Sequence, residues 1–309
     1  MILALGNPVY DYIETKKVKT PGRILSGCST NAALALAKMG RDVTLIGAVG
    51  DDFRLSMTDQ LNRYNIKSVL QASRETGGFS LIYYDDFGSR HLDLLGRADA
   101  IDKVDSGLLK KAEAVLIGPI LKEISFDLIT EIRRNFEGLF FCDPQGLLRD
   151  TGEDGRIYHK KPEGIEEIFG LFDIVKPNEL EAQVLTGIDC RRDPFEAARI
   201  IKGWGPKIVI VTLAELGSVI YDGNDFIETP PYQIDLVDST GAGDTYMAGF
   251  VHAYLKGEPL KKCGTFASCV SSIMIEQVGP DFKLTENEVL IRRNTLLEIN
   301  DFRVKLNAT

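Results

Sequence analysis

The segment Asp238-Ser239-Thr240-Gly241-Ala242-Gly243-Asp244-Thr245 holds the residue types that could bind an anion and move a proton. It follows an extended stretch and precedes a helix expected over Thr245–Leu255. The two glycines around Ala242 let the backbone approach a ligand closely, and the free N–H groups of a helix start attract anions. A carboxylate in the first helical turn, Asp244, could accept the proton of an attacking hydroxyl. The segment predicts a phosphoryl-transfer site; a capped helix start, with Asp244 serving only the helix dipole, is the alternative.

The elements around this segment predict a mostly parallel sheet. Short, buried, β-branched or aromatic runs, each followed by a turn signal, indicate strands at Ile2–Leu5, Val43–Val49, Ala114–Ile117, Leu139–Cys142, Ile174–Lys176 and Ile208–Thr212. Segments in which apolar residues have helical spacing lie between and after these strands. They are Asn31–Met39, Phe53–Tyr64, Phe126–Asn135, Glu179–Leu185, Pro194–Lys202, Thr245–Leu255 and Cys263–Glu276. Such alternation is typical of an α/β fold with helices on both faces, in which ligands bind beyond the carboxyl ends of the strands.

Two segments break this alternation. Val9–Leu25 and Phe79–Leu95 alternate polar and apolar residues, and 86–89 (Asp-Phe-Gly-Ser) is typical of a hairpin turn. We expect antiparallel strands of a small outlying sheet, a lid formed by residues 9–26 and 75–98 over a core of residues 1–8, 27–74 and 99–309. Two long surface loops are the alternative. The polar tail after Asn300 is expected to fray.

Composition and missing motifs exclude several classes of protein. With 45 acidic and 36 basic residues the net charge is -9, which disfavours a nucleic-acid partner. The sequence contains no apolar stretch of about 18 residues, so no membrane span is expected. The five cysteines contain no C-x-x-C pair, which favours a reducing cytoplasm over a zinc or disulfide framework. The chain has no Walker-type phosphate loop and no protein-kinase motifs, and its three histidines are isolated.

The segment 238–245 resembles the C-terminal signature of the ribokinase family, the PfkB-type carbohydrate and nucleoside kinases. Further matches follow in the same order along nearly the whole chain. The resemblance implies a ribokinase-like three-layer α/β/α domain with a β-sheet lid, and ATP and Mg²⁺ as cofactors. It also implies Asp244 as the catalytic base and the amides of Gly241, Ala242 and Gly243 as the anion hole.

On the acceptor side the resemblance covers three places. Asp11 stands where the family binds substrate hydroxyls, and Ser26–Asn31, with Gly27 and Asn31, is similar to the G-G-x-x-x-N substrate loop. A carboxylate and an amide suit a polyol, because they offer acceptors and donors in a fixed frame. Residues 143–149 resemble a D-P-Q-G-x-x-R variant in which Arg149 could meet a phosphate oxygen. The alternatives are a turn residue for Asp11, a helix N-cap for Asn31 and a surface side chain for Arg149.

On the donor side, Asn178 and Glu181 match the family N-x-x-E motif. The resemblance places Glu181 near Mg²⁺ through water, although a capping box would give the same pattern. Three further matches are expected near the nucleotide or a cation. The turn with Thr212, Glu215 and Gly217 is expected near the nucleotide, and a simple hairpin is the alternative. Ser268 is expected near adenine, and Asp238 with Thr240 near a monovalent cation such as K⁺.

The resemblance leaves the acceptor open: a sugar, a nucleoside or a cyclitol such as myo-inositol. A non-catalytic ligand sensor on this fold would be expected to lose the base, and Asp244 is present. A nucleotide-dependent oxidoreductase would carry its glycine fingerprint after the first strand, where this chain has Gly6-Asn7-Pro8. We also expect a homodimer joined through the lids, because the apolar residues Phe79, Leu81 and Tyr83 would need a partner on one lid face.

Overall fold

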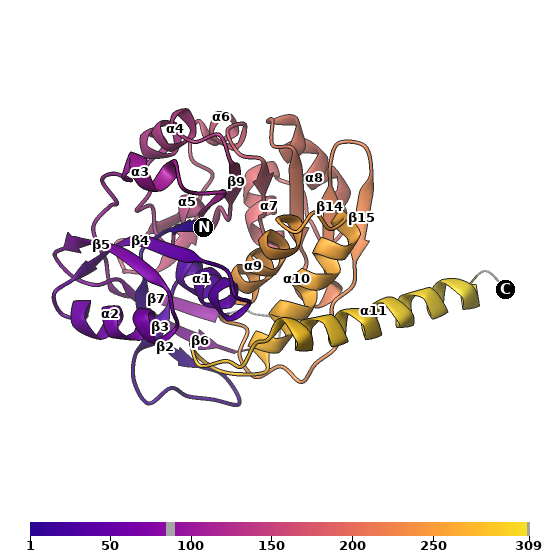
Figure 1. Ribbon diagram of the computed structural model, residues 1–309, viewed down its shortest axis with the longest axis horizontal. Helices are drawn as coiled ribbons and strands as arrows, with labels where there is room; N and C mark the ends of the chain where they lie inside the picture. The colour runs from indigo at the N-terminus through magenta and orange to yellow at the C-terminus, as the bar shows by residue number, and fades with distance from the viewer. Residues whose placement is uncertain (85–89, 308–309) are drawn as a thin grey trace.

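The computed structural model describes the backbone of residues 1–84 and 90–307, and side chains within those ranges up to residue 298. The hairpin turn predicted at 86–89 lies outside the described residues. The chain forms a central sheet covered by helices on both faces, with a smaller sheet beside it (Figure 1). The predicted three-layer α/β fold is confirmed.

The main sheet has nine strands in the order β15-β14-β13-β12-β9-β8-β1-β4-β5. Their bounds are β1 Ile2–Leu5, β4 Val43–Gly50, β5 Lys67–Ser73, β8 Ala114–Ile117, β9 Leu139–Cys142, β12 Ile174–Val175, β13 Ile208–Thr212, β14 Ser218–Tyr221 and β15 Phe226–Thr229. Strands from β5 to β13 pair in parallel, whereas β13, β14 and β15 pair antiparallel. All six strands predicted from apolar runs are present. Three strands are not among those runs. The edge strands β5 and β15 are half-exposed and have no continuous apolar run, and β14 is a short buried strand that directly follows the turn ending at Gly217.

The helices divide between the two faces of this sheet. One face carries α1 Cys28–Lys38, α2 Arg54–Arg63, α9 Ala242–Tyr254, α10 Leu260–Ile275 and α11 Glu286–Asn307. The other carries α3 Ser106–Leu109, α4 Phe126–Arg134, α6 Ile165–Phe169, α7 Glu179–Thr186 and α8 Pro194–Gly203, with the single turn α5 Gln145–Leu148. Helix α11 projects from the body and runs to Asn307, through the tail expected to fray (Figure 1).

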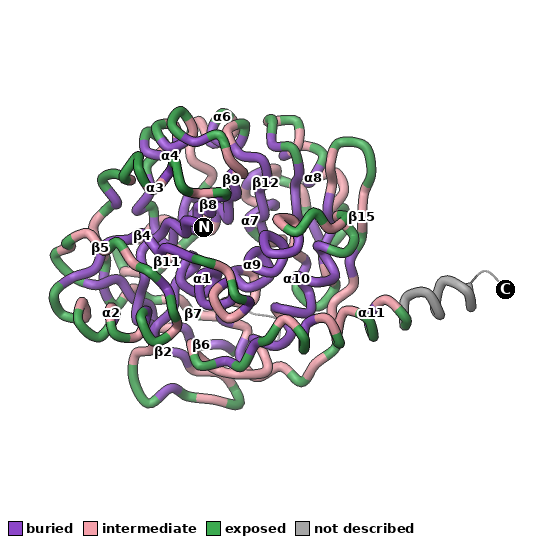
Figure 2. Tube along the Cα trace, in the orientation of Figure 1, coloured by how far each residue is buried: buried purple, intermediate pink, exposed green. Residues whose placement is uncertain are grey.

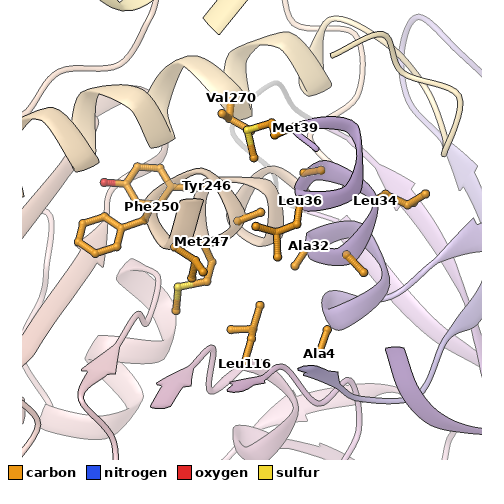
Figure 3. Packing of buried hydrophobic residues seen from close by; sticks show 14 of the residues in the cluster. Ala4, Ala32, Leu34, Leu36, Met39, Leu116, Tyr246, Met247, Phe250 and Val270 are labelled. Carbon is orange, nitrogen blue, oxygen red and sulfur yellow. The ribbon is translucent and has the colours of Figure 1, made fainter. Parts of the chain in front are cut away.

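Alternate residues of each strand feed the two halves of the core, as the period-two geometry of a strand requires. In β1, Ile2 and Ala4 face α1 and α9, whereas Leu3 and Leu5 face α4 and its neighbours. Figure 2 shows the resulting buried layer running through the central strands, α1 and α9. Figure 3 shows Leu36 of α1 near Met247 of α9, above the strands. This packing holds the starts of the two helices side by side.

The smaller sheet has the order β3-β2-β6-β7, with β2 Val9–Glu14, β3 Ile24–Ser26, β6 Gly78–Tyr83 and β7 Arg90–Gly96. Its strands lie within the two ranges expected for the lid. The expectation that all of them pair antiparallel is wrong in one place, because β2 and β6 are parallel. Both strands enter the lid from the core, so they run in the same direction.

The inner face of the lid is apolar and is covered by the same chain. Phe79, Leu81 and Tyr83 pack in a cluster with Val9 and Ile120. The argument that these three residues need a second subunit is therefore wrong. Ile82 and Tyr84 are the large apolar residues of β6 and its end that remain exposed. A homodimer through the lids stays a prediction that would have to use this outer face.

A short hairpin that the sequence did not predict extends the lid. It consists of β10 Arg149–Thr151 and β11 Ile157–His159, which pair antiparallel. A bridge between Asp93 of β7 and Arg156 joins it to the lid sheet. The hairpin begins at Arg149, so it brings that side chain to the space under the lid.

Candidate active site

The starts of α1 and α9 meet at the carboxyl edge of the sheet. Gly241 precedes α9 with φ 80°, and no side chain among the described residues caps this helix. A Cβ at Gly241 would lie 2.8 Å from Asn31 Nδ2, so only glycine fits both the backbone conformation and the contact. The N–H of Ala242 donates to the carbonyl of Ser239 at 3.2 Å. The N–H groups of Gly243 and Asp244 have no partner among the described residues and remain available to an anion.

Asp244 lies in the first turn of α9 and is buried. Asn31 Nδ2 donates a hydrogen bond of 2.9 Å to its Oδ2. Burial, and next the charge of Asp143, raise the pKa of Asp244 to about 6. A carboxylate of that pKa is a better proton acceptor than an ordinary aspartate and is still ionised at neutral pH. Asn31 lies inside α1, whose N-cap is Gly27, so the N-cap alternative for Asn31 is wrong.

A buried ion pair lies behind the α9 start. Lys176 Nζ is 2.9 Å from Asp143 Oδ2, and both side chains are almost completely buried. Burial by itself would lower the pKa of Lys176, but Asp143 and Glu181 outweigh it and raise the pKa. A Cβ on Gly243 would lie 3.3 Å from Lys176 Nζ. An ammonium group therefore lies beside the open helix start and adds positive charge there.

Cys28, the first residue of α1, completes a compact group with these carboxylates. Its Sγ and one oxygen each of Asp143 and Asp244 lie within 4.8 Å of one another. Burial first, then the two carboxylates, raise the pKa of the Cys28 thiol well above its usual range. The thiol is therefore protonated at neutral pH and is a poor nucleophile.

Asp11 lies within β2, so the turn alternative for this residue is wrong. Its Oδ1 accepts a hydrogen bond of 2.8 Å from the backbone N–H of Phe79, across the lid sheet. Burial raises the pKa of Asp11 to about 6. The carboxylate is thus fixed in orientation at the cavity wall, where it could accept hydrogen bonds from hydroxyl groups.

Arg149 is not a surface side chain, because only 4% of it is exposed. Its Nη1 donates to the carbonyl of Ile120 at 3.3 Å and its Nη2 to Gln145 Oε1 at 2.7 Å. Its Nε is buried and has no hydrogen-bond partner among the described residues. Burial, and next the charge of Arg90, lower the pKa of Arg149. A buried cation with a spare donor is suited to an anionic or strongly polar ligand.

One cavity joins these groups, and its lining is mixed. Its polar side chains are those of Asp11, Ser26, Asn31, Arg90, Gln145, Arg149, Thr240 and Asp244, with Gly27, Cys28 and Gly241 beside them. Its apolar side chains are those of Phe79, Leu81 and Leu92 of the lid, with the ring of Tyr83, and of Ile120 from the loop after β8. The lid thus supplies most of the apolar contacts, and both the lid, through Asp11 and Arg90, and the core supply polar ones.

Asn178 and Glu181 form a complete capping box at the start of α7. Asn178 Oδ1 accepts from the Glu181 N–H at 2.9 Å, and Glu181 Oε2 accepts from the Asn178 N–H at 2.9 Å. Glu181 Oε1 also accepts from Asn178 Nδ2 at 2.8 Å. Burial first, and then Asp143, raise the pKa of Glu181 to about 7. The capping alternative is thus confirmed for this pair, and both Glu181 oxygens already have a partner.

The other residues assigned to the donor side are grouped less tightly. Thr212 bridges to Asn178 at the end of β13. Glu215 accepts from Arg191 at 2.8 Å, and the same arginine donates to Glu179 at 3.0 Å, so the turn is linked to α7. Gly217 ends that turn with φ 94°.

Ser268 is linked to this turn through Pro230, because a Cβ on Gly217 would lie 3.1 Å from Pro230 Cα. The Ser268 hydroxyl donates to the carbonyl of Pro230 at 2.9 Å and accepts from the N–H of Tyr232. Asp238 Oδ1 accepts from the Thr240 N–H at 2.9 Å. Its Oδ2 is buried and without a hydrogen-bond partner among the residues described. That oxygen could act as a ligand to a cation.

The structure brings the predicted acceptor-side residues and the glycine segment into one cavity, and it adds residues that sequence reasoning missed. In the sequence, Asp143 begins the motif 143–149 and Lys176 ends a predicted strand, and neither is assigned a role of its own. A lysine at the end of a buried strand was the available signal. Cys28 and Gln145 lie within the segments 26–31 and 143–149 singled out above, and Tyr83 lies in the expected lid, but their places in the cavity depend on tertiary packing.

No helix in the described part of the chain is long and apolar enough to span a bilayer. The sequence matches the model of the pfkB family carbohydrate kinases over residues 3–287. It is 40% identical over 309 residues to a nucleoside kinase of Methanocaldococcus jannaschii, covering 94% of this chain and 96% of the relative. It is 31% identical over 264 residues to a cytidine kinase of Thermococcus kodakarensis, covering 80% and 85%.

Among solved structures, the fold is similar to a pyrophosphate-dependent kinase in the ribokinase family complexed with a pyrophosphate analog and myo-inositol. The TM-score is 0.79 at 25% identity, with 94% of this chain and 100% of that chain covered. The order of the strands and the open, glycine-rich start of α9 are consistent with these similarities. The chain belongs to the pfkB family of carbohydrate kinases and is a phosphotransferase that acts on an alcohol group.

Proposed function

We propose that the protein transfers the γ-phosphoryl group of ATP to a ribose hydroxyl of a nucleoside. The observation that carries the proposal is the mixed lining of the cavity, in which Leu81, Leu92 and Ile120 face the same space as the hydrogen-bonding side chains. A ribose would place its hydroxyls against Asp11, Asn31 and Asp244, and a nucleobase would lie against the apolar residues. A free sugar or a cyclitol carries hydroxyl groups on all sides and would leave these apolar residues poorly covered. The two relatives named as nucleoside and cytidine kinases support this choice.

The polar residues of the cavity would divide the chemistry between them. Asp244 accepts the proton of the attacking hydroxyl as the new oxygen–phosphorus bond forms, and the bond to ADP breaks. The N–H groups at the start of α9 and the ammonium of Lys176 stabilise the negative charge on the transferring group. Asn31 holds the Asp244 carboxylate in place through its hydrogen bond. The lid excludes water, so that the alcohol is the acceptor.

The residues present fit a divalent cation near the donor phosphates. Asp143 and Glu181 are buried carboxylates, and burial and Asp143 raise the pKa of Glu181 to about 7. Positive charge nearby would relieve this repulsion. Glu181 would act through water, because Asn178 occupies both of its oxygens. A bound Mg²⁺ would neutralise charge on the donor oxygens. The free Oδ2 of Asp238 supports a monovalent cation such as K⁺ near Thr240.

A second candidate is a cyclitol kinase. The structural neighbour with myo-inositol supports it, and Asp11 and Asn31 would suit any polyol. The apolar residues of the lid distinguish a nucleoside kinase from a cyclitol kinase. Leu81 and Leu92 are cross-strand partners that both line the cavity, so their side chains matter for a base and little for a cyclitol.

A panel assay tests the proposal. Phosphoryl transfer would be measured with ATP and with pyrophosphate as donors, and with nucleosides, ribose and myo-inositol as acceptors. We expect nucleosides with ATP to give the highest kcat/KM. In the L81N/L92S variant the nucleoside kcat/KM should fall about tenfold or more, since each leucine contributes about 1.5–3 kcal/mol of burial. L95N, a change of the exposed Leu95 on β7, is the matched control. A preference for myo-inositol that the L81N/L92S variant leaves unchanged would overturn the assignment.

A further inference from the structure

The lid reaches across the cavity and contacts the loop that leads into α9. Tyr83 Oη and Thr240 Oγ1 are 2.8 Å apart, in a buried hydrogen bond. Thr15 Oγ1 donates to the carbonyl of Val237 at 3.2 Å. Lys17 pairs with Asp235 on the surface at 2.5 Å. Three lid residues therefore hold one short segment, 235–240, of the core.

The contact of Tyr83 is the one that lies inside the site. Thr240 immediately precedes Gly241, and its backbone N–H is already fixed by Asp238 Oδ1 at 2.9 Å. Tyr83 and Thr240 both line the cavity. Arg90 Nη1 donates to Tyr83 Oη at 3.2 Å, so the Tyr83 hydroxyl accepts from Arg90 and can donate to Thr240. The hydroxyl thus joins lid strand β6 to the residue before the anion-binding amides.

We infer that Tyr83 is a positioning residue that couples closure of the lid to the geometry of the glycine segment. The inference rests on the phosphoryl-transfer role proposed for that segment, and it holds for any acceptor that the lid encloses. Tyr83 of the lid and Thr240 of the core both line the cavity, so a lid that opens to admit an acceptor would separate them. The bond would form again when the lid closes over the acceptor, and it would then fix the segment 238–241.

The physical reason is that the charge-stabilising amides must be held closely in position. Misplacing such groups by about 1 Å costs on the order of 10²-fold in rate. Gly241 gives the segment freedom, since glycine adopts many backbone conformations and here has φ 80°. A hydrogen bond to the neighbouring residue restricts that freedom. With the lid open the amides would be less ordered, so transfer of the phosphoryl group to water would be disfavoured.

A different role for Tyr83 would be direct contact with the acceptor. The two roles give different kinetics. A contact made equally in the ground state and the transition state changes KM and leaves kcat unchanged, whereas ordering of the amides in the closed state acts on kcat.

Kinetics of Y83F in the full-length protein test the inference, with Y84F as the matched control. Tyr84 undergoes the same chemical change one residue away, on the exposed outer face of the lid. The acceptor is whichever one the wild type turns over best. We expect kcat of Y83F to fall about three- to tenfold, as loss of one hydrogen bond predicts. The acceptor KM should stay within about twofold, and Y84F should match the wild type.

A double-mutant cycle with T240V separates coupling from independent effects. If Tyr83 acts through Thr240, Y83F/T240V should be no slower than T240V alone. A raised acceptor KM with normal kcat in Y83F, unchanged kinetics in Y83F, or additive effects in the cycle would each overturn the inference. Failure of the proposed nucleoside activity is a separate result, because it would appear in the wild type as turnover of another acceptor only.

Discussion

Helices α9 and α7 both start at the carboxyl edge of the sheet, but they satisfy their first N–H groups in opposite ways. Before α9 stands Gly241 with φ 80°, and no described side chain caps the helix. Helix α7 starts with a capping box in which Asn178 and Glu181 bond to each other's backbone. The α9 start is therefore open to an external anion, whereas the α7 start is closed by its own side chains.

The difference shows how the site separates function from stability. An open helix start leaves its donors unpaired until a ligand arrives, and a buried carboxylate beside it adds to the cost. Helix α1 has the same open form, with Gly27 at φ 117° and no side-chain cap from the described residues. The two open starts are held together by Asn31 and Asp244 and by the packing of α1 on α9 (Figure 3). The closed start of α7, which follows strand β12, supports these two helix starts.

The largest expected effect comes from removing the base at the open start. We expect D244N to fold and to lose about 10²–10⁴-fold in kcat, the usual range for a general base. Turnover with the preferred acceptor measures it, and circular dichroism checks the fold. Activity within about threefold of the wild type would show that Asp244 is not the base.

Closing the open start with a methyl group should have the next largest effect. Alanine at Gly241 would be strained at φ 80° and would press on Asn31 Nδ2, 2.8 Å from its Cβ. We expect kcat of G241A to fall by up to about 10²-fold, the scale of a lost charge-stabilising donor. G243A is the comparison, because its Cβ meets only the end of Lys176, at 3.3 Å. G243A should be the milder change, and G243V, with a branched side chain, should be severe. Equal activity of G241A and the wild type would contradict an anion site here.

The pH dependence of kcat and of stability should show the cost of burying the Asp244 carboxylate at the open start. Since the pKa of Asp244 is raised to about 6, kcat should fall about tenfold per pH unit below pH 6. A raised folded-state pKa means that the ionised group opposes folding, so its stability contribution is largest below about pH 4 and is lost as the pH rises through 6. D244N should therefore melt higher than the wild type at pH 7. A lower melting temperature at pH 7 would contradict burial as the main cause of the shift.

Much of the fold was predictable from the sequence, because buried strands carry continuous apolar runs. The starts of the two open helices were not. Helices α1 and α9 begin three residues earlier than predicted, at Cys28 and Ala242. Glycines and an absent side-chain cap remove the usual start signals. The start of α7, marked by its capping box, was predicted correctly at Glu179.

In the site, the residues within contiguous motifs were predictable, and those supplied by folding were not. Asp244 and Asn31 lie 213 positions apart, and only the family resemblance connected them before the structure. The lid pairing was misassigned for the same reason. Whether β2 and β6 are parallel depends on where both strands leave the core, which no local pattern encodes. A role for Lys176 in the site can be inferred only once its burial next to Asp143 is known.

The smallest expected effect is at the closed start of α7, and it decides what the capping box is for. N178A should lower the free energy of unfolding by about 1 kcal/mol, since an N-cap side chain is lost. E181Q keeps the backbone part of the box, because the glutamine oxygen can also accept from the Asn178 N–H, but it loses the bond from Asn178 Nδ2. It also removes a buried charge whose pKa is raised to about 7, which offsets that loss, so E181Q should lower the melting temperature less than N178A does. If Glu181 also acts on Mg²⁺ through water, E181Q needs more Mg²⁺ for half-maximal activity. A normal Mg²⁺ requirement together with reduced stability would make α7 a purely structural element, and the contrast with α9 would then be complete.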